Sequence, residues 1–251
     1  MIKQYLKKRI KMSYGVLNTY FRKVDRKYDD TKYWDNIFYT DGISDSKTIS
    51  KNKSLITTKY HYNSMESLIL KHLRNNLISI HNSHILDIGS GSGHWIDFYV
   101  SLDAGVITGI DVSNTSFNYL NKKYTNNPNI KIYQGRALEV INKLNSTYDV
   151  VNAVGVMFHI VDDFKWQNTI YSIGKVINKG GIFIIGGHFG IFNGLNVQID
   201  NNGINKRLKS RKHWKKILKR AGFIHVKFYR NYSYLKINDT IPENNVLIAT
   251  K

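Results

Sequence analysis

A glycine-rich turn between a predicted strand and a predicted helix is the feature of this sequence that most clearly indicates ligand chemistry. The turn, Gly89-Ser-Gly-Ser-Gly93, follows the apolar run at residues 84–88 and precedes a helical pattern at residues 95–102. Glycine lets the backbone turn sharply and lets a ligand approach main-chain N–H groups closely. The turn alone is weak evidence, because many glycine turns between a strand and a helix serve only tight packing.

A carboxylate at the end of the next predicted strand strengthens this interpretation. Asp111 follows the apolar run at residues 105–110 and lies 18 residues after Gly93. A carboxylate at this place can accept hydrogen bonds from two ribose hydroxyls. The turn and Asp111 together predict a nucleoside-bearing ligand at the switch point of a doubly wound sheet.

The elements that position these residues alternate between short apolar runs and helical patterns. Such alternation predicts a parallel sheet with helices on both faces. The expected strands are residues 84–88, 105–110, 130–133, 148–154 and 181–185, and the helices between them are 95–102, 116–123, 137–144 and 166–177.

The two ends of the chain differ from this central pattern. Residues 64–77 have the spacing of an amphipathic helix, residues 40–58 are expected to form a mobile loop, and residues 189–209, rich in Asn and Gly, an adaptable loop. After a helix at 213–221, two consecutive strands at 224–235 and 245–250 should pair as an antiparallel hairpin at the sheet edge.

Composition excludes several classes of protein. The 251 residues are 42% hydrophobic and 22% charged, which is ordinary for a globular domain and rules out disorder and collagen-like repeats. The absence of cysteine excludes disulfides, thiolate catalysis and Cys-ligated zinc. With no apolar membrane span and no signal-peptide core in the sequence, we expect a soluble, cytoplasmic protein.

The net charge of +19 has two explanations. A basic surface can bind RNA or an anionic membrane. However, the sequence has 28 Lys against 9 Arg, together with 27 Asn and 2 Pro, which is what A/T-rich coding would produce. Both explanations stay open, and the basic start at residues 5–11 is compatible with either a surface-binding helix or a solvated one.

The motif Ile85-Leu-Asp-Ile-Gly-Ser-Gly-Ser-Gly93 resembles that of the class I S-adenosylmethionine-dependent methyltransferases. The resemblance implies a doubly wound, seven-stranded, mostly parallel α/β sheet with an antiparallel C-terminal strand. It divides the chain into a basic N-terminal helical extension or lid, residues 1–63, and a methyltransferase domain, residues 64–251. Further segments that resemble the family in order are residues 148–154, 158–163, 179–185, 214–223 and 246–250.

The same resemblance implies which residues bind S-adenosylmethionine. The turn would line the methionine portion and the sulfonium, Asp87 would lie near the amino group, and Asp111 would hold the ribose. The full predicted set is Asp87, Gly89, Ser90, Gly91, Gly93, Asp111, Val112, Ser113, Arg136, Ala137, Ala153 and Val154.

Arg136 departs from the family pattern. Many members have an acidic residue at this position, where it often contacts the adenine amino group. Two interpretations remain for Arg136: it stacks on the base, or it is exposed to solvent while the backbone of residues 135–137 contacts the base.

Two histidines are candidates for a general base, which helps when the acceptor is a hydroxyl. His159 lies in the loop after the fourth strand, and His188 follows the fifth, so both are expected at the carboxyl ends of the strands. Each could instead be structural. Asp162 and Asp163 could orient a base or cap the next helix. No spacing predicts a metal site.

Three functions therefore remain. The favoured one is methyl transfer to an oxygen or nitrogen of a small metabolite, sugar or lipid precursor. The second is an RNA methyltransferase that uses the basic segment from Lys206 to Lys236, although no N-P-P-Y-type motif follows the fourth strand. The third is a donor-binding protein without catalysis. The sequence does not predict the oligomeric state.

Overall fold

The computed structural model describes residues 28–49, 54–190, 192–200, 203–231 and 244–251. The basic segment at residues 5–11 and Lys236 lie outside this range. Among the described residues, no helix is both long and apolar enough to cross a membrane, and no group of three or more His, Asp or Glu side chains is placed to hold a metal ion.

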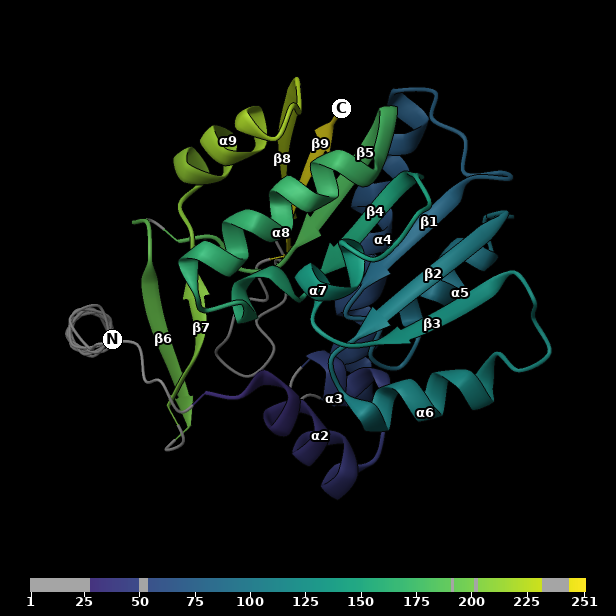
Figure 1. Ribbon diagram of the computed structural model, residues 1–251, viewed down its shortest axis with the longest axis vertical. Coiled ribbons are helices and arrows are strands. Elements are labelled where there is room, and N and C mark those ends of the chain that lie inside the picture. The colour runs from purple at the N-terminus through teal and green to yellow at the C-terminus, as the bar shows by residue number, and fades with distance from the viewer. Residues whose placement is uncertain (1–27, 50–53, 191, 201–202, 232–243) are drawn as a thin grey trace.

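A seven-stranded sheet forms the centre of the molecule, as predicted (Figure 1). Its strand order is β3-β2-β1-β4-β5-β9-β8, and the first five are mutually parallel. The strands are β1 (His84–Ile88), β2 (Val106–Asp111), β3 (Ile130–Gln134), β4 (Tyr148–Val154), β5 (Ile177–Gly186), β8 (His225–Asn231) and β9 (Asn244–Thr250).

The predicted C-terminal hairpin is present, with β9 between β5 and β8 and antiparallel to both. Residues 246–249 of β9 are at most 1% exposed. Such an apolar run needs cover on both faces and both edges, whereas β8, with Lys227 and Arg230, suits the edge. The hairpin therefore places its second strand inside the sheet.

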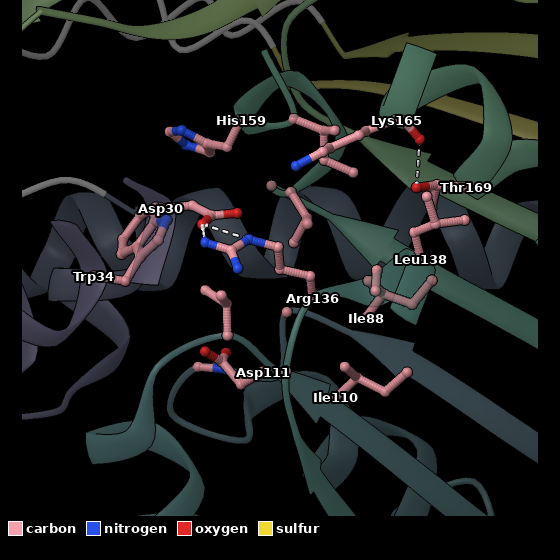
Figure 2. A pocket seen from close by; sticks show the side chains of 18 of the residues that line it. Asp30, Trp34, Ile88, Ile110, Asp111, Arg136, Leu138, His159, Lys165 and Thr169 are labelled. Atoms are coloured by element: carbon pink, nitrogen blue, oxygen red, sulfur yellow. Dashed lines mark hydrogen bonds and ion pairs between the residues drawn. The ribbon is translucent and has the colours of Figure 1, made fainter. Parts of the chain in front are cut away.

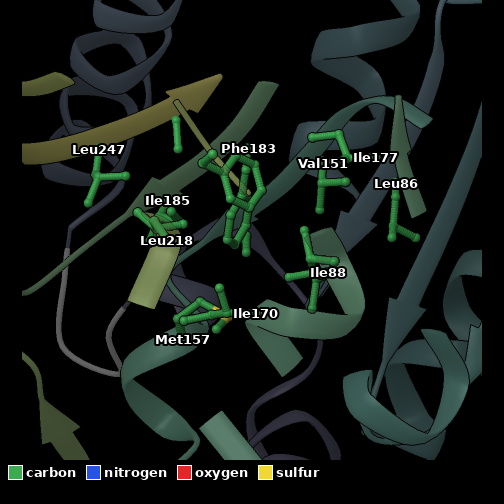
Figure 3. Close-up of a cluster of buried hydrophobic side chains, with 14 of the residues drawn as sticks. Leu86, Ile88, Val151, Met157, Ile170, Ile177, Phe183, Ile185, Leu218 and Leu247 are labelled. Atoms are coloured by element: carbon green, nitrogen blue, oxygen red, sulfur yellow. The ribbon is translucent and has the colours of Figure 1, made fainter. Parts of the chain in front are cut away.

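Helices cover both faces of this sheet. On one face α7 (Ala137–Ile141), α8 (Asp163–Val176) and α9 (Arg211–Arg220) bury the cluster shown in Figure 3, in which Ile170 and Leu218 meet Ile88 and Phe183 of the sheet. On the other face α4 (Leu55–Asn75) and α5 (His94–Val100) bury a second cluster around Ile69, and α6 (Asn114–Lys123) packs on β2 and β3.

The expectation of a loop at residues 40–58 was wrong for its described part. Helix α2 (Asp30–Asp41) is followed by α3 (Asp45–Ile49), and α4 begins at Leu55 after the N-cap Ser54. The predicted domain boundary at 63/64 falls inside α4. Figure 1 shows α2 and α3 beside the arrowheads of β2 and β3, where the strands end.

Residues 189–209 were also expected to be a loop, and this was wrong. They contain the antiparallel strands β6 (Leu195–Asp200) and β7 (Gly203–Leu208), which form a separate two-stranded sheet. Asn201 and Asn202 separate the two strands in the sequence and are followed by Gly203. This combination is typical of a hairpin turn, and alternating apolar residues flank it.

Candidate functional site

The glycine turn has the backbone conformation that its sequence predicts. Gly89 and Gly91 have φ angles of 74° and 53°, in the left-handed region that side chains disfavour. A Cβ at Gly91 would lie 2.7 Å from Cγ2 of Thr48, and one at Gly89 would collide with Val156. These two positions therefore favour glycine, and both line the space above the sheet.

Asp111 ties this turn to the end of β2. Its Oδ2 accepts a hydrogen bond from Gly91 N (2.8 Å) and its Oδ1 accepts one from Ser113 N (2.9 Å). Burial raises the pKa of the Asp111 carboxyl above its usual range, and the two backbone donors oppose that shift. Each oxygen keeps a second lone pair for a ligand hydroxyl.

A cavity of about 270 Å³ lies above these residues (Figure 2). Its walls come from the ends of β1, β2, β3 and β4 and from α2 and α8. Among its lining residues are Tyr28, Asp30, Trp34, Phe38, Thr48, Gly89, Gly91, Asp111, Val112, Arg136, Ala137, Leu138, Val154, His159, Lys165 and Thr169.

Helix α2 is fixed to this site by carboxylates. Asp35 accepts hydrogen bonds from Ser113 Oγ (2.5 Å) and Thr115 N (3.0 Å), at the start of α6. Asp30 Oδ1 accepts from Arg136 Nη2 (2.7 Å) and Nε (3.0 Å). Arg136 thus forms an ion pair with α2, and its side chain is still 39% exposed.

Helix α3 is fixed beside the glycine turn by His94. The imidazole lies between Asp45 (Nδ1 to Oδ2, 3.0 Å) and Glu66 (Nε2 to Oε1, 2.7 Å), and it stacks on Tyr62 at 3.4 Å between ring centroids. Ser92 of the turn donates to Asp45 (2.6 Å). Tyr62 of α4 is thus part of the packing beside the turn.

His159 is held in one tautomer at the cavity wall. It ends the 3₁₀ helix η1 (Met157–His159), and its Nδ1 lies 2.8 Å from the carbonyl oxygen of Asn205 in β7. A carbonyl only accepts, so Nδ1 carries the proton and Nε2 keeps its lone pair. Burial, with Lys206 as a second cause, lowers the pKa of His159 to about 3, so the ring is neutral at pH 7.

These features match those of known methyltransferases. Residues 85–181 match the sequence profile of a family described as a methyltransferase domain. The chain has the fold of the class I methyltransferases.

Solved structures with this fold share little sequence with this chain. Magnesium protoporphyrin IX methyltransferase from Synechocystis PCC 6803 is 14% identical, with a TM-score of 0.62 over 91% of this chain and 100% of that chain. The N-methyltransferase NodS from Bradyrhizobium japonicum WM9 is 12% identical, with a TM-score of 0.61 over 88% and 98%.

A third similar structure is the 1,6-didemethyltoxoflavin-N1-methyltransferase from Burkholderia thailandensis. It is 14% identical, with a TM-score of 0.61 over 91% of this chain and 93% of that chain. No curated protein matches the sequence.

The fold brings part of the predicted set of residues to the cavity. Gly89, Gly91, Asp111, Val112, Arg136, Ala137, Val154 and His159 line it. Five predicted donor-binding residues lie behind or beside the wall: Asp87, Ser90, Gly93, Ser113 and Ala153. Their roles, like those of the lining residues, stay predictions.

Asp87 is the most deeply placed of these five. It is fully buried in β1, where Oδ1 accepts from Asn152 Nδ2 (2.7 Å) and Oδ2 has no hydrogen-bond partner among the described residues. Burial raises the pKa of Asp87 to about 6. This unsatisfied carboxylate oxygen lies behind the cavity wall.

His188 and Asp163 do not line the cavity that holds His159, whereas Asp162 does. His188 faces the ring of Phe158 at 5.2 Å. Asp162 caps α8 by accepting from Lys165 N (2.8 Å) and also lines the cavity. Asp163 pairs with Arg207 (2.7 Å) and Lys209, which joins α8 to β7.

Sequence reasoning missed the wall that α2 supplies. Tyr28, Asp30, Trp34 and Phe38 come from a segment assigned only as a helical extension or lid. The spacing of Trp34 and Phe38, with Ile37 beside them, does place apolar residues on one helical face. Nothing in the sequence indicates that this face meets residues more than 100 positions away.

Proposed function

We propose that this protein transfers a methyl group from S-adenosylmethionine to an oxygen or nitrogen of a small-molecule acceptor. The observation that supports this most strongly is a single cavity whose wall contains the glycine turn and Asp111 together with the neutral imidazole of His159.

The residues present fit such a donor. Gly89 and Gly91 of the turn line the cavity, and Asp111 keeps lone pairs for ribose hydroxyls. Val112, Ala137 and Leu138 give the same wall an apolar section for a planar base. When bound, the donor supplies an already activated methyl group on its sulfonium, so the protein mainly needs to align the acceptor.

His159 is placed to accept the proton that the acceptor loses. Because Nδ1 donates to Asn205, the nitrogen that can accept a proton is Nε2. Its lowered pKa keeps it unprotonated at neutral pH but also makes it a weak base, so it suits an acceptor that loses an acidic proton. The Trp34 ring meets the imidazole edge-on, with 5.1 Å between centroids, and fixes the plane of the ring. Trp34 and Phe38 also exclude water from this side of the cavity.

The basic segment is only partly taken up by contacts within the protein. Arg207 and Lys209 pair with Asp163, Lys206 lies over the Phe158 ring at 5.1 Å, and Lys227 donates to Asn76 (3.2 Å). Lys209 is only 2% exposed. The basic side chains of α9 are exposed, however: Arg211, Lys212, Lys215, Lys216, Lys219 and Arg220. A basic face is therefore left on this helix, and the RNA alternative needs its own test.

Calorimetric titration with S-adenosylmethionine and with S-adenosylhomocysteine tests the proposal first. We expect dissociation constants on the order of micromolar, about −8 kcal/mol. A screen of small acceptors for release of S-adenosylhomocysteine then separates an enzyme from a donor-binding protein without catalysis. Absence of binding for both ligands would contradict the proposal.

A salt series separates the RNA alternative. Phosphate-driven binding weakens steeply as salt rises, whereas a small neutral acceptor shows little dependence. RNA binding that falls by orders of magnitude between low and moderate salt, with methyl incorporation into RNA, would replace the small acceptor. A cytoplasmic location stays a prediction from the sequence.

A further inference from the structure

One end of the cavity is formed by side chains that have no role so far in the proposed binding of the methyl donor. A nucleoside whose ribose lies on Asp111 in a doubly wound fold extends its base past the end of β2 toward the loop after β3. That loop contains Arg136, and the same end of the cavity is lined by Asp30 of α2 and by Tyr28, which precedes this helix.

Arg136 cannot recognise the amino group of adenine. A guanidinium only donates hydrogen bonds, and the 6-amino group of adenine also donates. The base end of the cavity therefore needs an acceptor oxygen from another residue.

Asp30 supplies that oxygen. Its Oδ1 accepts from Arg136 at 2.7 and 3.0 Å and from Thr31 N at 3.0 Å, whereas Oδ2 accepts no hydrogen bond among the described residues. The side chain is 29% exposed, and Figure 2 shows Asp30 and Arg136 meeting across the cavity. Arg136 thus orients the carboxylate and leaves one oxygen for a ligand.

The other carboxylates that line the cavity are less suited. Asp111 lies at the ribose position, and Asp162 caps α8. Glu139 is exposed on α7 and remains the competing acceptor.

A second feature also indicates a polar ligand group at this end. The hydroxyl of Tyr28 is buried and has no hydrogen-bond partner among the described residues. Buried polar atoms are almost always paired, so an unpaired one in a cavity wall favours a ligand there. A ring nitrogen of the base, which accepts, would pair with this hydroxyl.

We propose that Asp30 of helix α2 accepts a hydrogen bond from the 6-amino group of the donor's adenine, and that Arg136 is the residue that positions Asp30. This inference rests on the proposed donor function. Helix α2 is then part of the donor site, and it determines which base the site accepts.

The test compares two ligands by calorimetry: S-adenosylhomocysteine and S-inosylhomocysteine, in which an oxo group replaces the 6-amino group. Wild-type protein should bind the adenine compound about 10 to 100 times more tightly, as expected for a hydrogen bond to a charged group. In Asp30→Asn this preference should fall to near unity, because an amide can also donate to the oxo group.

Three further variants make the comparison specific. Asp29→Asn makes the same charge change one residue away, outside the cavity wall. Asp29 contacts Arg136 at 3.5 Å, longer than the 2.7 Å contact of Asp30, so this variant should keep the wild-type preference. Arg136→Lys should keep most of the preference and Arg136→Gln should reduce it, since only the former can still pair with Asp30. The ratio of the two affinities is unaffected by any general loosening of α2, which would weaken both ligands alike.

The proposal is overturned if Asp30→Asn keeps the wild-type ratio, or if it weakens both ligands equally. It is also overturned if Glu139→Gln, and not Asp30→Asn, removes the preference. Wild-type protein that binds neither ligand would reject the donor function itself, whereas tight binding without base preference rejects only the role of Asp30.

Discussion

The two sides of the cavity are built by different kinds of contact. The sheet side, residues 85–93 and 106–113, is held by backbone hydrogen bonds and by two buried carboxylates, Asp87 and Asp111. The cover, residues 28–49 and 195–208, is held by side-chain pairs such as Asp30 with Arg136. The sheet side is therefore inseparable from the fold, whereas single side-chain changes can loosen the cover without unfolding the domain.

The largest expected effect is at the contact between the cover and η1. His159→Ala should lower turnover of an acceptor by about 10² to 10⁴-fold, the usual contribution of a general base. Affinity for S-adenosylhomocysteine should change by no more than about twofold, as for a substitution outside the donor contacts. Steady-state kinetics and calorimetry measure the two quantities.

His188→Ala is the matched variant for this comparison. Its ring faces Phe158 and lies outside the cavity wall, so we expect a smaller loss of turnover than for His159→Ala. A larger loss would assign the proton transfer to His188.

The next effect tests the sheet side. Asp111→Ala removes the acceptor of two buried N–H groups together with the proposed ribose contact. We expect affinity for S-adenosylhomocysteine to fall by about 100-fold or more, and the melting temperature to fall by several degrees. Loss of affinity without loss of stability would mean that the turn is not held by Asp111.

A smaller effect tests the anchoring of the cover. Asp35→Ala leaves Ser113 Oγ and Thr115 N without their acceptor and should cost about 1 kcal/mol, the usual loss for a helix cap. Because α2 is attached to the sheet side by side-chain contacts, hydrogen exchange should increase in residues 30–41 and stay unchanged in β1. Equal increases in both would show that the cover and the sheet unfold together.

The smallest effect concerns the pairing of α8 with β7. Arg207, with Lys209, holds the pKa of Asp163 down at about 2, below its ordinary value. A lowered folded-state pKa gives stability that is present above about pH 4 and is lost as pH falls toward 2. Urea unfolding should show Asp163→Asn less stable than wild type at pH 7, with the difference vanishing across that window.

The sheet side was predictable from the sequence and the cover was not. Glycines with positive φ, a carboxylate after a strand and alternating apolar runs are local patterns, so β1, β2 and the turn lie where the sequence predicts them. The pair of Asp30 and Arg136 joins residues 106 positions apart, and no local pattern encodes such a contact. Arg136 could be recognised in the sequence as unusual, but its partner could not.

The hairpin β6–β7 was missed for a different reason. The many Asn and Gly residues in 189–209 favoured a loop, although the alternation of Leu195 and Val197 with polar residues is typical of a strand. As a result the residue that fixes the tautomer of His159, Asn205 in β7, was not among the predicted site residues.

The position of β9 has a consequence for biosynthesis. Until residues 244–250 have been translated, β5 has an open edge, because Val246 to Ala249, which pair with it, have not yet been made. The parallel half of the sheet can form earlier on the ribosome, while β8 has no partner until β9 arrives. A nascent chain that stops before residue 244 would thus expose an apolar strand edge, which is a substrate for chaperones and a site of aggregation.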